Sequence, residues 1–113
     1  MKRVTTIKLS ELSDMAKKMY GDLVKAVADT EKNIIVVDAE LHVDEEQMLL
    51  ESGSKQRNLW GFNLYPKRFG TDKFIVYDSM INIRPSQQNT SRSVENEEIR
   101  EQIKAIVAKV VQP

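Results

Sequence analysis

Glu40, His42 and Asp44 are the residues of this chain whose types and spacing are most typical of a catalytic or metal-binding site. Carboxylates and imidazole are the usual metal ligands and proton carriers, so the three residues suggest a metal site or acid–base catalysis. On a strand they share a face, but a rise of about 3.3 Å per residue separates Glu40 from Asp44 by about 13 Å. We therefore predict no metal site and no cofactor, and treat His42 and Glu40 as candidate general bases.

Polar residues also occur in the second half of the chain at positions where a plain core would have apolar ones. Asparagine is disfavoured in strands, and the backbone of Arg84 is restricted by the following Pro85. Arg84 is therefore a candidate for holding an anionic group, although it could instead pair with the acidic segment, for example with Glu40. The predicted binding residues are Asn63, Tyr65, Ser79, Asn82, Arg84 and Asn89.

Six of the seven aromatic residues lie between Trp60 and Tyr77, in a basic part of the chain. Sheets with this composition stack bases and contact phosphates. Strand alternation instead assigns Trp60, Phe62 and Phe74 to the core and leaves Tyr65 and Tyr77 as the exposed rings. Weak nucleic-acid binding is the minor alternative, since the chain has no glycine-rich phosphate loop and no net positive charge.

Length and composition predict one globular domain over residues 1–113. Hydrophobic residues make up 41% of the chain and charged residues 30%, which excludes the disordered classes. The absence of cysteine excludes disulfides and thiolate metal sites. The longest apolar runs, such as residues 34–37, fall far short of the roughly 20 residues that span a bilayer, so we expect a cytoplasmic protein without membrane contact.

The first helix is predicted at about residues 11–20, with Ser10 as N-cap and Gly21 as terminator. Two alternatives follow: the helix continues through Gly21, or a strand begins at Leu23. We favour the strand, because the β-branched run at 34–37 needs a partner and Asn33 suits a turn with positive φ. The later elements are a short helix at 45–52 capped by Asp44, strands at 57–65 and 73–84, an exposed connection at 86–96, and a helix at 97–111.

These elements predict an α+β fold with a mainly antiparallel sheet of about four strands, formed by the hairpins 23–42 and 57–84. The N-terminal and C-terminal helices cover one face. Whether residues 2–8 add an edge strand is not decided by the sequence. In the second hairpin we expect Leu64 beside Phe74 and Gly61 opposite Tyr77.

A homodimer is expected for two reasons. Two helices cover only part of the sheet, and the charges form complementary blocks. Residues 29–51 contain eight acidic residues and one lysine, whereas residues 52–93 contain seven basic residues and two acidic ones.

Several segments together resemble a family of small bacterial and archaeal proteins known only as a domain of unknown function. The segments are Glu40-Leu41-His42 with Asp44, Leu50 with Gly53-Ser54, Gln56, Leu59-Trp60-Gly61 with Asn63, Tyr65-Pro66, and Ser79 with Ile81-Asn82-Ile83-Arg84-Pro85 and Asn89. The chain departs from the family pattern at Asp38-Ala39, where paired glycines are expected. The resemblance implies a stand-alone prokaryotic cytoplasmic protein and supports the hairpin at 23–42, but it supplies no activity, cofactor or catalytic residue.

The sequence therefore supports two main hypotheses. The first is a noncatalytic binding or assembly protein, with a small anionic ligand or a partner at a polar site around Glu40, His42, Asn63, Asn82 and Arg84. The second is a small hydrolase-like enzyme with His42 or Glu40 as general base and Arg84 at an anionic group. Convergence of His42 and Arg84 in an open cleft, within about 6 Å, would favour the enzyme.

Overall fold

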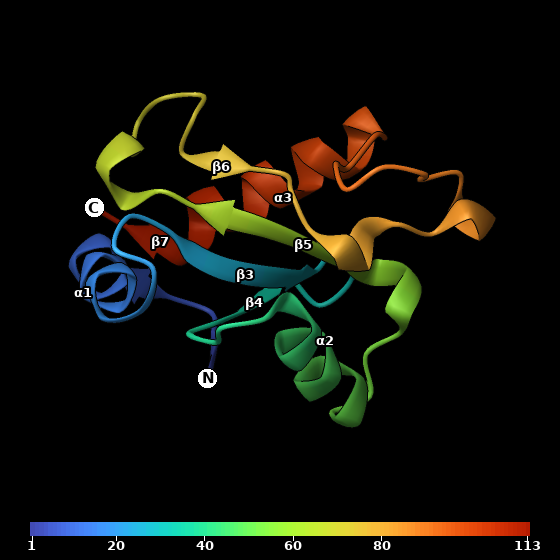
Figure 1. The fold of residues 1–113 in the computed structure, drawn as a ribbon, viewed down its shortest axis with the longest axis horizontal. Helices are drawn as coiled ribbons and strands as arrows, with labels where there is room; N and C mark the ends of the chain where they lie inside the picture. Colours follow the sequence, from blue (N-terminus) through green and yellow to red (C-terminus); the bar gives the residue numbers. More distant parts are fainter.

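A five-stranded antiparallel sheet lies at the centre of the α+β fold in the computed structural model, which describes residues 1–113 (Figure 1). Across the sheet the strands are β1 (Lys2–Val4), β4 (Ile34–Val37), β3 (Val24–Asp29), β5 (Leu59–Leu64) and β6 (Ile75–Val76). A second, two-stranded parallel pair joins β2 (Ile7–Lys8) to β7 (Val111–Gln112). The segment at 2–8 thus supplies the edge strand β1 and the short strand β2.

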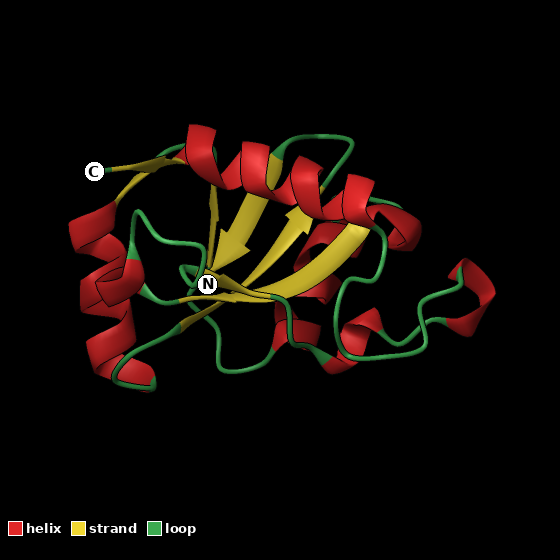
Figure 2. Ribbon diagram, turned by 90° about the horizontal axis from the view of Figure 1, so that it is seen from above, coloured by secondary structure: helices red, strands yellow, loops and turns green.

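Three α-helices cover the two faces of the sheet. They are α1 (Leu9–Met19), α2 (His42–Glu51) and α3 (Glu97–Val110). Helices α1 and α3 pack on one face in the larger core cluster, and Figure 2 shows α3 crossing the strands. Helix α2 packs on the opposite face, where its Leu49 contacts a smaller apolar cluster from β3, β4 and β5.

The first hairpin confirms the favoured alternative. Helix α1 ends at Met19, and Gly21 has a φ of +92° that stops the helix. Strands β3 and β4 then pair in an antiparallel register, with Ala28 opposite Ile35. Asn33 in the connecting turn has a φ of 58°, as expected for a residue that tolerates this conformation. The helix does begin slightly earlier than predicted, and Lys8 rather than Ser10 is its N-cap.

The second hairpin is shorter than predicted. Strand β6 ends at Val76, and the remainder of the predicted strand contains a 3-10 turn, η3 (Met80–Asn82). A second 3-10 turn, η4 (Pro85–Gln87), follows the predicted strand. Two further 3-10 turns, η1 (Gln56–Asn58) and η2 (Pro66–Arg68), flank β5. The predicted register is wrong by one residue, because Leu64 lies opposite Ile75 rather than Phe74.

The start of α2 is a further correction. His42 is the first residue of this helix rather than the end of a strand, and Leu41 takes the N-cap position that we assigned to Asp44. Part of the second sheet face is therefore covered by α2, which removes one of the two reasons for expecting a homodimer. The dimer stays a prediction. None of the helices is long and apolar enough to cross a membrane.

Candidate functional site

The face of the sheet under α2 changes from apolar to polar along the strands. Cross-strand pairs on this face join Asp29 to Leu59, Val27 to Gly61, and Lys25 to Asn63. Val27 and Leu59 belong to the apolar cluster under Leu49. Lys25 and Asn63, one pair further along, place an ammonium and an amide where a covered sheet face normally carries apolar side chains.

Helix α2 turns polar residues toward the same end of the sheet. Its buried residues are His42, Glu45, Glu46 and Leu49, which the three- and four-residue spacing places on one face. Only Leu49 contributes to an apolar cluster. A helix that buries one imidazole and two carboxyl groups against a sheet is unusual enough to indicate a role beyond packing.

His42 is held in a defined orientation by β5. Its Nε2 atom lies 2.8 Å from the Phe62 carbonyl oxygen, which can only accept, so Nε2 carries a proton. Burial lowers the pKa of His42, and the nearby Lys25 lowers it further, against the opposing effects of the Phe62 carbonyl, Asp78 and the Asn63 amide. The ring is therefore neutral near pH 7, and its Nδ1 atom is a free acceptor.

A cavity of about 330 Å³ opens beside His42, between the start of α2, strands β3 and β5, and residues 78–81. Its lining includes both apolar and polar residues. The apolar lining consists of Leu23, Leu41, Val43, Met80 and Ile81. The polar lining consists of Lys25, His42, Asn63, Tyr65, Asp78, Ser79 and Arg92.

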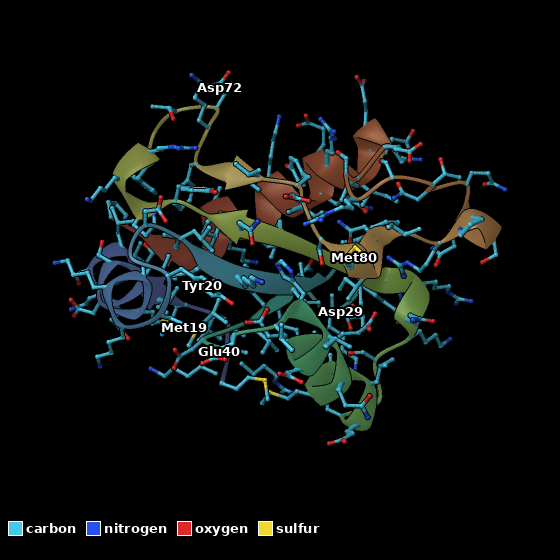
Figure 3. The ribbon with its side chains drawn as sticks, in the orientation of Figure 1. Met19, Tyr20, Asp29, Glu40, Asp72 and Met80 are labelled. Carbon is cyan, nitrogen blue, oxygen red and sulfur yellow. The ribbon has the colours of Figure 1, made fainter.

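The charged groups of the cavity are unequally paired. Arg92 Nε donates to Asp78 Oδ1 at 2.6 Å, which neutralises both side chains. Lys25 makes no ion pair, and its ammonium lies 5.0 Å from the centre of the Tyr20 ring. In Figure 3, Tyr20 and Glu40 lie together near the end of α1, where the Tyr20 hydroxyl donates to the Glu40 carbonyl oxygen. The cavity thus holds one cation without an anionic partner.

Asn63 has an unused acceptor in this cavity. Its Nδ2 atom donates to the Asp78 carbonyl oxygen at 3.3 Å, which fixes the orientation of the amide. The Oδ1 atom has no hydrogen-bond partner, although Asn63 is only 7% exposed. A buried acceptor without a donor costs free energy, so it marks a place where a ligand or water is expected.

Asn82 fastens the segment after β6 to the central sheet. Gly61 N–H donates to Asn82 Oδ1 at 2.9 Å, and Asn82 Nδ2 donates to the Gly61 carbonyl oxygen at 2.9 Å and to the Arg92 carbonyl oxygen at 3.0 Å. This amide takes the place of a neighbouring strand along β5. We expected Tyr77 opposite Gly61, and the structure places Asn82 and Ser79 there instead.

Asn89 organises the following loop in the same way. Its Nδ2 atom donates to the carbonyl oxygens of Asn82, Ser91 and Ser93, and its Oδ1 atom accepts from Glu95 N–H. An isolated bridge also joins Asn89 to Arg84. This loop carries Arg92 back toward the cavity.

The Arg84 guanidinium binds backbone carbonyl oxygens rather than an acidic side chain. Its Nη1 atom donates to the Gln56 carbonyl oxygen and its Nη2 atom to the Leu59 carbonyl oxygen at 2.6 Å. The guanidinium stacks 4.1 Å above the Trp60 ring. Burial lowers the pKa of Arg84, and nearby Glu46 opposes this change. The predicted pairing of Arg84 with Glu40 is wrong, because Glu40 is exposed and lines a separate surface hollow with Asp44.

The predicted polar site therefore divides into two groups. His42, Asn63, Tyr65 and Ser79 line the cavity, whereas Asn82, Arg84 and Asn89 satisfy backbone groups around it. His42 and Arg84 do not share a cleft, since they bind different carbonyl oxygens of β5 and only His42 lines the cavity.

Lys25 and Asp78 were not predicted from the sequence as cavity residues, and neither was the burial of Glu45 and Glu46. Alternation along β3 is the signal that could have found Lys25, since it shares a face with Val27. For the glutamates, the signal is their helical spacing from His42 and Leu49.

Replacing Arg84 with lysine tests the scaffold role assigned to it. We expect the free energy of unfolding to fall by about 2 kcal/mol, because an ammonium lacks the planar fork that reaches both carbonyl oxygens while it stacks flat on the indole. Urea denaturation measures this change. The control is Arg57→Lys, because Arg57 is exposed and its side chain makes no hydrogen bond or ion pair. Equal stability of the two variants would contradict the assignment.

Together, these features define a small α+β protein with a partly polar cavity beside its central strands. The chain belongs to the family described as protein of unknown function (DUF5674), whose model matches residues 3–110. No curated protein and no solved structure matches the chain significantly.

Proposed function

We propose that this protein is a noncatalytic binding protein that holds a small anionic molecule in the cavity beside His42. The observation that carries the proposal is Lys25, which lines the cavity and whose ammonium has no carboxylate partner. Neutral His42 and the internally paired Arg92 and Asp78 leave Lys25 as the unbalanced charge. An anionic group of a ligand would complete this arrangement.

Size and lining support a small ligand with an apolar part. Ligand cavities commonly occupy about 300 to 1,000 Å³, so a volume of about 330 Å³ suits a molecule of few atoms. Five of the residues that line it are aliphatic or thioether side chains: Leu23, Leu41, Val43, Met80 and Ile81. The ligand is therefore amphipathic, with a charged end toward Lys25.

The enzyme hypothesis has less support from the geometry. It requires His42 or Glu40 to act together with Arg84, and these three side chains lie in separate places. Nucleic-acid binding has less support too, because Trp60, Phe62 and Phe74 are buried in the core. An assembly role, a cytoplasmic location and a prokaryotic source stay predictions from the sequence.

Replacing Lys25 with methionine tests the proposed function. The change removes the charge and keeps most of the aliphatic stem, so we expect binding of small carboxylic acids to weaken at least about tenfold, as for loss of a charged hydrogen bond. Thermal-shift titration with a panel of such acids measures the effect. The control, Lys18→Met, changes an exposed lysine of α1 and should leave the titrations unchanged. Identical titrations for the two variants would contradict the proposal.

A further inference from the structure

Two hydrogen-bond acceptors in the cavity lack donors. One is Asn63 Oδ1, which is buried, and the other is His42 Nδ1, because the His42 proton is on Nε2. The Asn63 amide also lies close enough to the ring to favour its protonated form. A ligand that is only an anion would leave Asn63 Oδ1, the buried acceptor, without a partner.

Lys25, the unpaired cation, and Asn63, which has an unused acceptor, lie side by side on the sheet. Lys25 and Asn63 are direct cross-strand partners on the same sheet face, so their Cβ atoms are about 5 Å apart. One small molecule can therefore present an anion to Lys25 and a donor to Asn63 at the same time. A carboxylate with a donor on the adjacent carbon has this arrangement.

We propose that the ligand is a 2-hydroxy carboxylic acid with a short apolar side chain. Its carboxylate contacts Lys25, its hydroxyl donates to Asn63 Oδ1 or His42 Nδ1, and its side chain lies against Leu41 and Met80. This inference rests on the proposed function and adds the chemical class of the ligand.

Charge distinguishes the hydroxy acid from the corresponding amino acid. The cavity has one unbalanced positive charge, on Lys25, and a hydroxy acid brings one negative charge. A zwitterionic amino acid brings a second ammonium close to Lys25, with Asp78 already paired to Arg92. Repulsion between the two ammonium groups favours the hydroxyl as the donor.

Calorimetric titration of the full chain with three matched molecules tests the inference. The probes are 2-hydroxy-4-methylpentanoate, 4-methylpentanoate without the hydroxyl, and leucine. We expect the hydroxy acid to bind at least about tenfold more tightly than either of the others. The acid without the hydroxyl leaves a buried acceptor unpaired, and leucine brings its ammonium close to Lys25. The variant Asn63→Leu, similar in shape but without the acceptor, should reduce this preference.

The outcomes separate the inference from the proposed function. Equal binding of the hydroxy acid and 4-methylpentanoate, with both weakened by Lys25→Met, overturns the hydroxyl assignment and supports an anion site. Tighter binding of leucine overturns the choice of donor. If none of the three binds at millimolar concentration, this inference is overturned. The comparison of the natural chain with Lys25→Met on the wider panel of carboxylic acids then tests the proposed function separately.

Discussion

Replacing Gly61 with alanine is expected to lower the free energy of unfolding by about 3 kcal/mol, from overpacking and loss of buried hydrogen bonds. A Cβ atom at Gly61 would lie 2.6 Å from Ser79 Oγ, 2.7 Å from Ser79 Cβ and 3.1 Å from Ile81 Cγ1. The segment carrying Ser79 and Ile81 must then move away from β5 and stretch the bonds that Asn82 makes to Gly61. Urea denaturation measures the loss.

A double variant provides the control for this prediction. Ser79→Gly removes the two closest atoms, so Gly61→Ala combined with Ser79→Gly should recover part of the stability that Gly61→Ala alone loses. Recovery is incomplete because Ile81 still lies close. If Gly61→Ala is as stable as the natural chain, residues 78–81 do not lie tightly on β5, and the cavity they border is not as described.

Glu45→Gln is expected to raise the free energy of unfolding by about 3 kcal/mol at neutral pH. Glu45 is fully buried, and neither carboxyl oxygen has a hydrogen-bond partner. Burial raises the pKa of Glu45 from 4.5 to about 10, against smaller opposing effects of the Ala39 backbone and Lys25. The folded chain must therefore take up a proton that the unfolded chain has released at neutral pH, and glutamine removes this cost.

The pH dependence of this gain gives a second test. Below about pH 4.5 both states hold the proton, so the substitution gains nothing; above it, the gain grows by about 1.4 kcal/mol per pH unit until the folded group ionises near pH 10. Denaturation of both chains at several pH values measures the difference. Glu51→Gln, at an exposed position of the same helix, should show no such trend. A gain that does not vary with pH would contradict the burial of a neutral acid.

The neutral state of Glu45 also bears on the cavity. Lys25 is among the charges close enough to influence Glu45. An ionised Glu45 would attract the Lys25 ammonium, whereas a protonated one leaves it available to a ligand. The cost of burying Glu45 is thus consistent with a site that keeps its cation free, since functional sites commonly carry such costs.

The parts of the fold that sequence predicted well have strong local signals. The β-branched run of β4 needed a partner strand, and Asn33 supplied a turn residue with positive φ. Helix α3 was predicted within one residue of its observed end, because Asn96 caps it and its apolar stripe has helical spacing.

The elements that were predicted wrongly lack such signals. Helix α2 buries His42, Glu45 and Glu46, so apolar periodicity gave no reason to start the helix at His42. Beyond Val76, the chain is held to β5 by side-chain amides and a guanidinium rather than by a strand ladder. Alternation does not detect this kind of pairing, so the segment was mistaken for a longer strand.

The candidate site was only partly predictable for a related reason. Asn63 and Asn82 carry the same amide, yet Asn82 uses its amide on the backbone of β5 and Asn63 keeps an acceptor free. Residue type shows that a side chain can form hydrogen bonds to a ligand. Tertiary structure decides whether those hydrogen-bonding atoms are already used within the protein. Sequence therefore identified the polar residues but did not separate cavity from scaffold.

Heteronuclear NMR titration of the chain with 2-hydroxy-4-methylpentanoate tests this separation most directly. Saturable shift changes are expected at the backbone amides of Lys25, His42, Asn63 and Ser79, which line the cavity. The amides of Arg84 and Asn89, which belong to the scaffold, should change little. Changes centred on Arg84 and Asn89, or no saturable change at the cavity residues, would contradict the account.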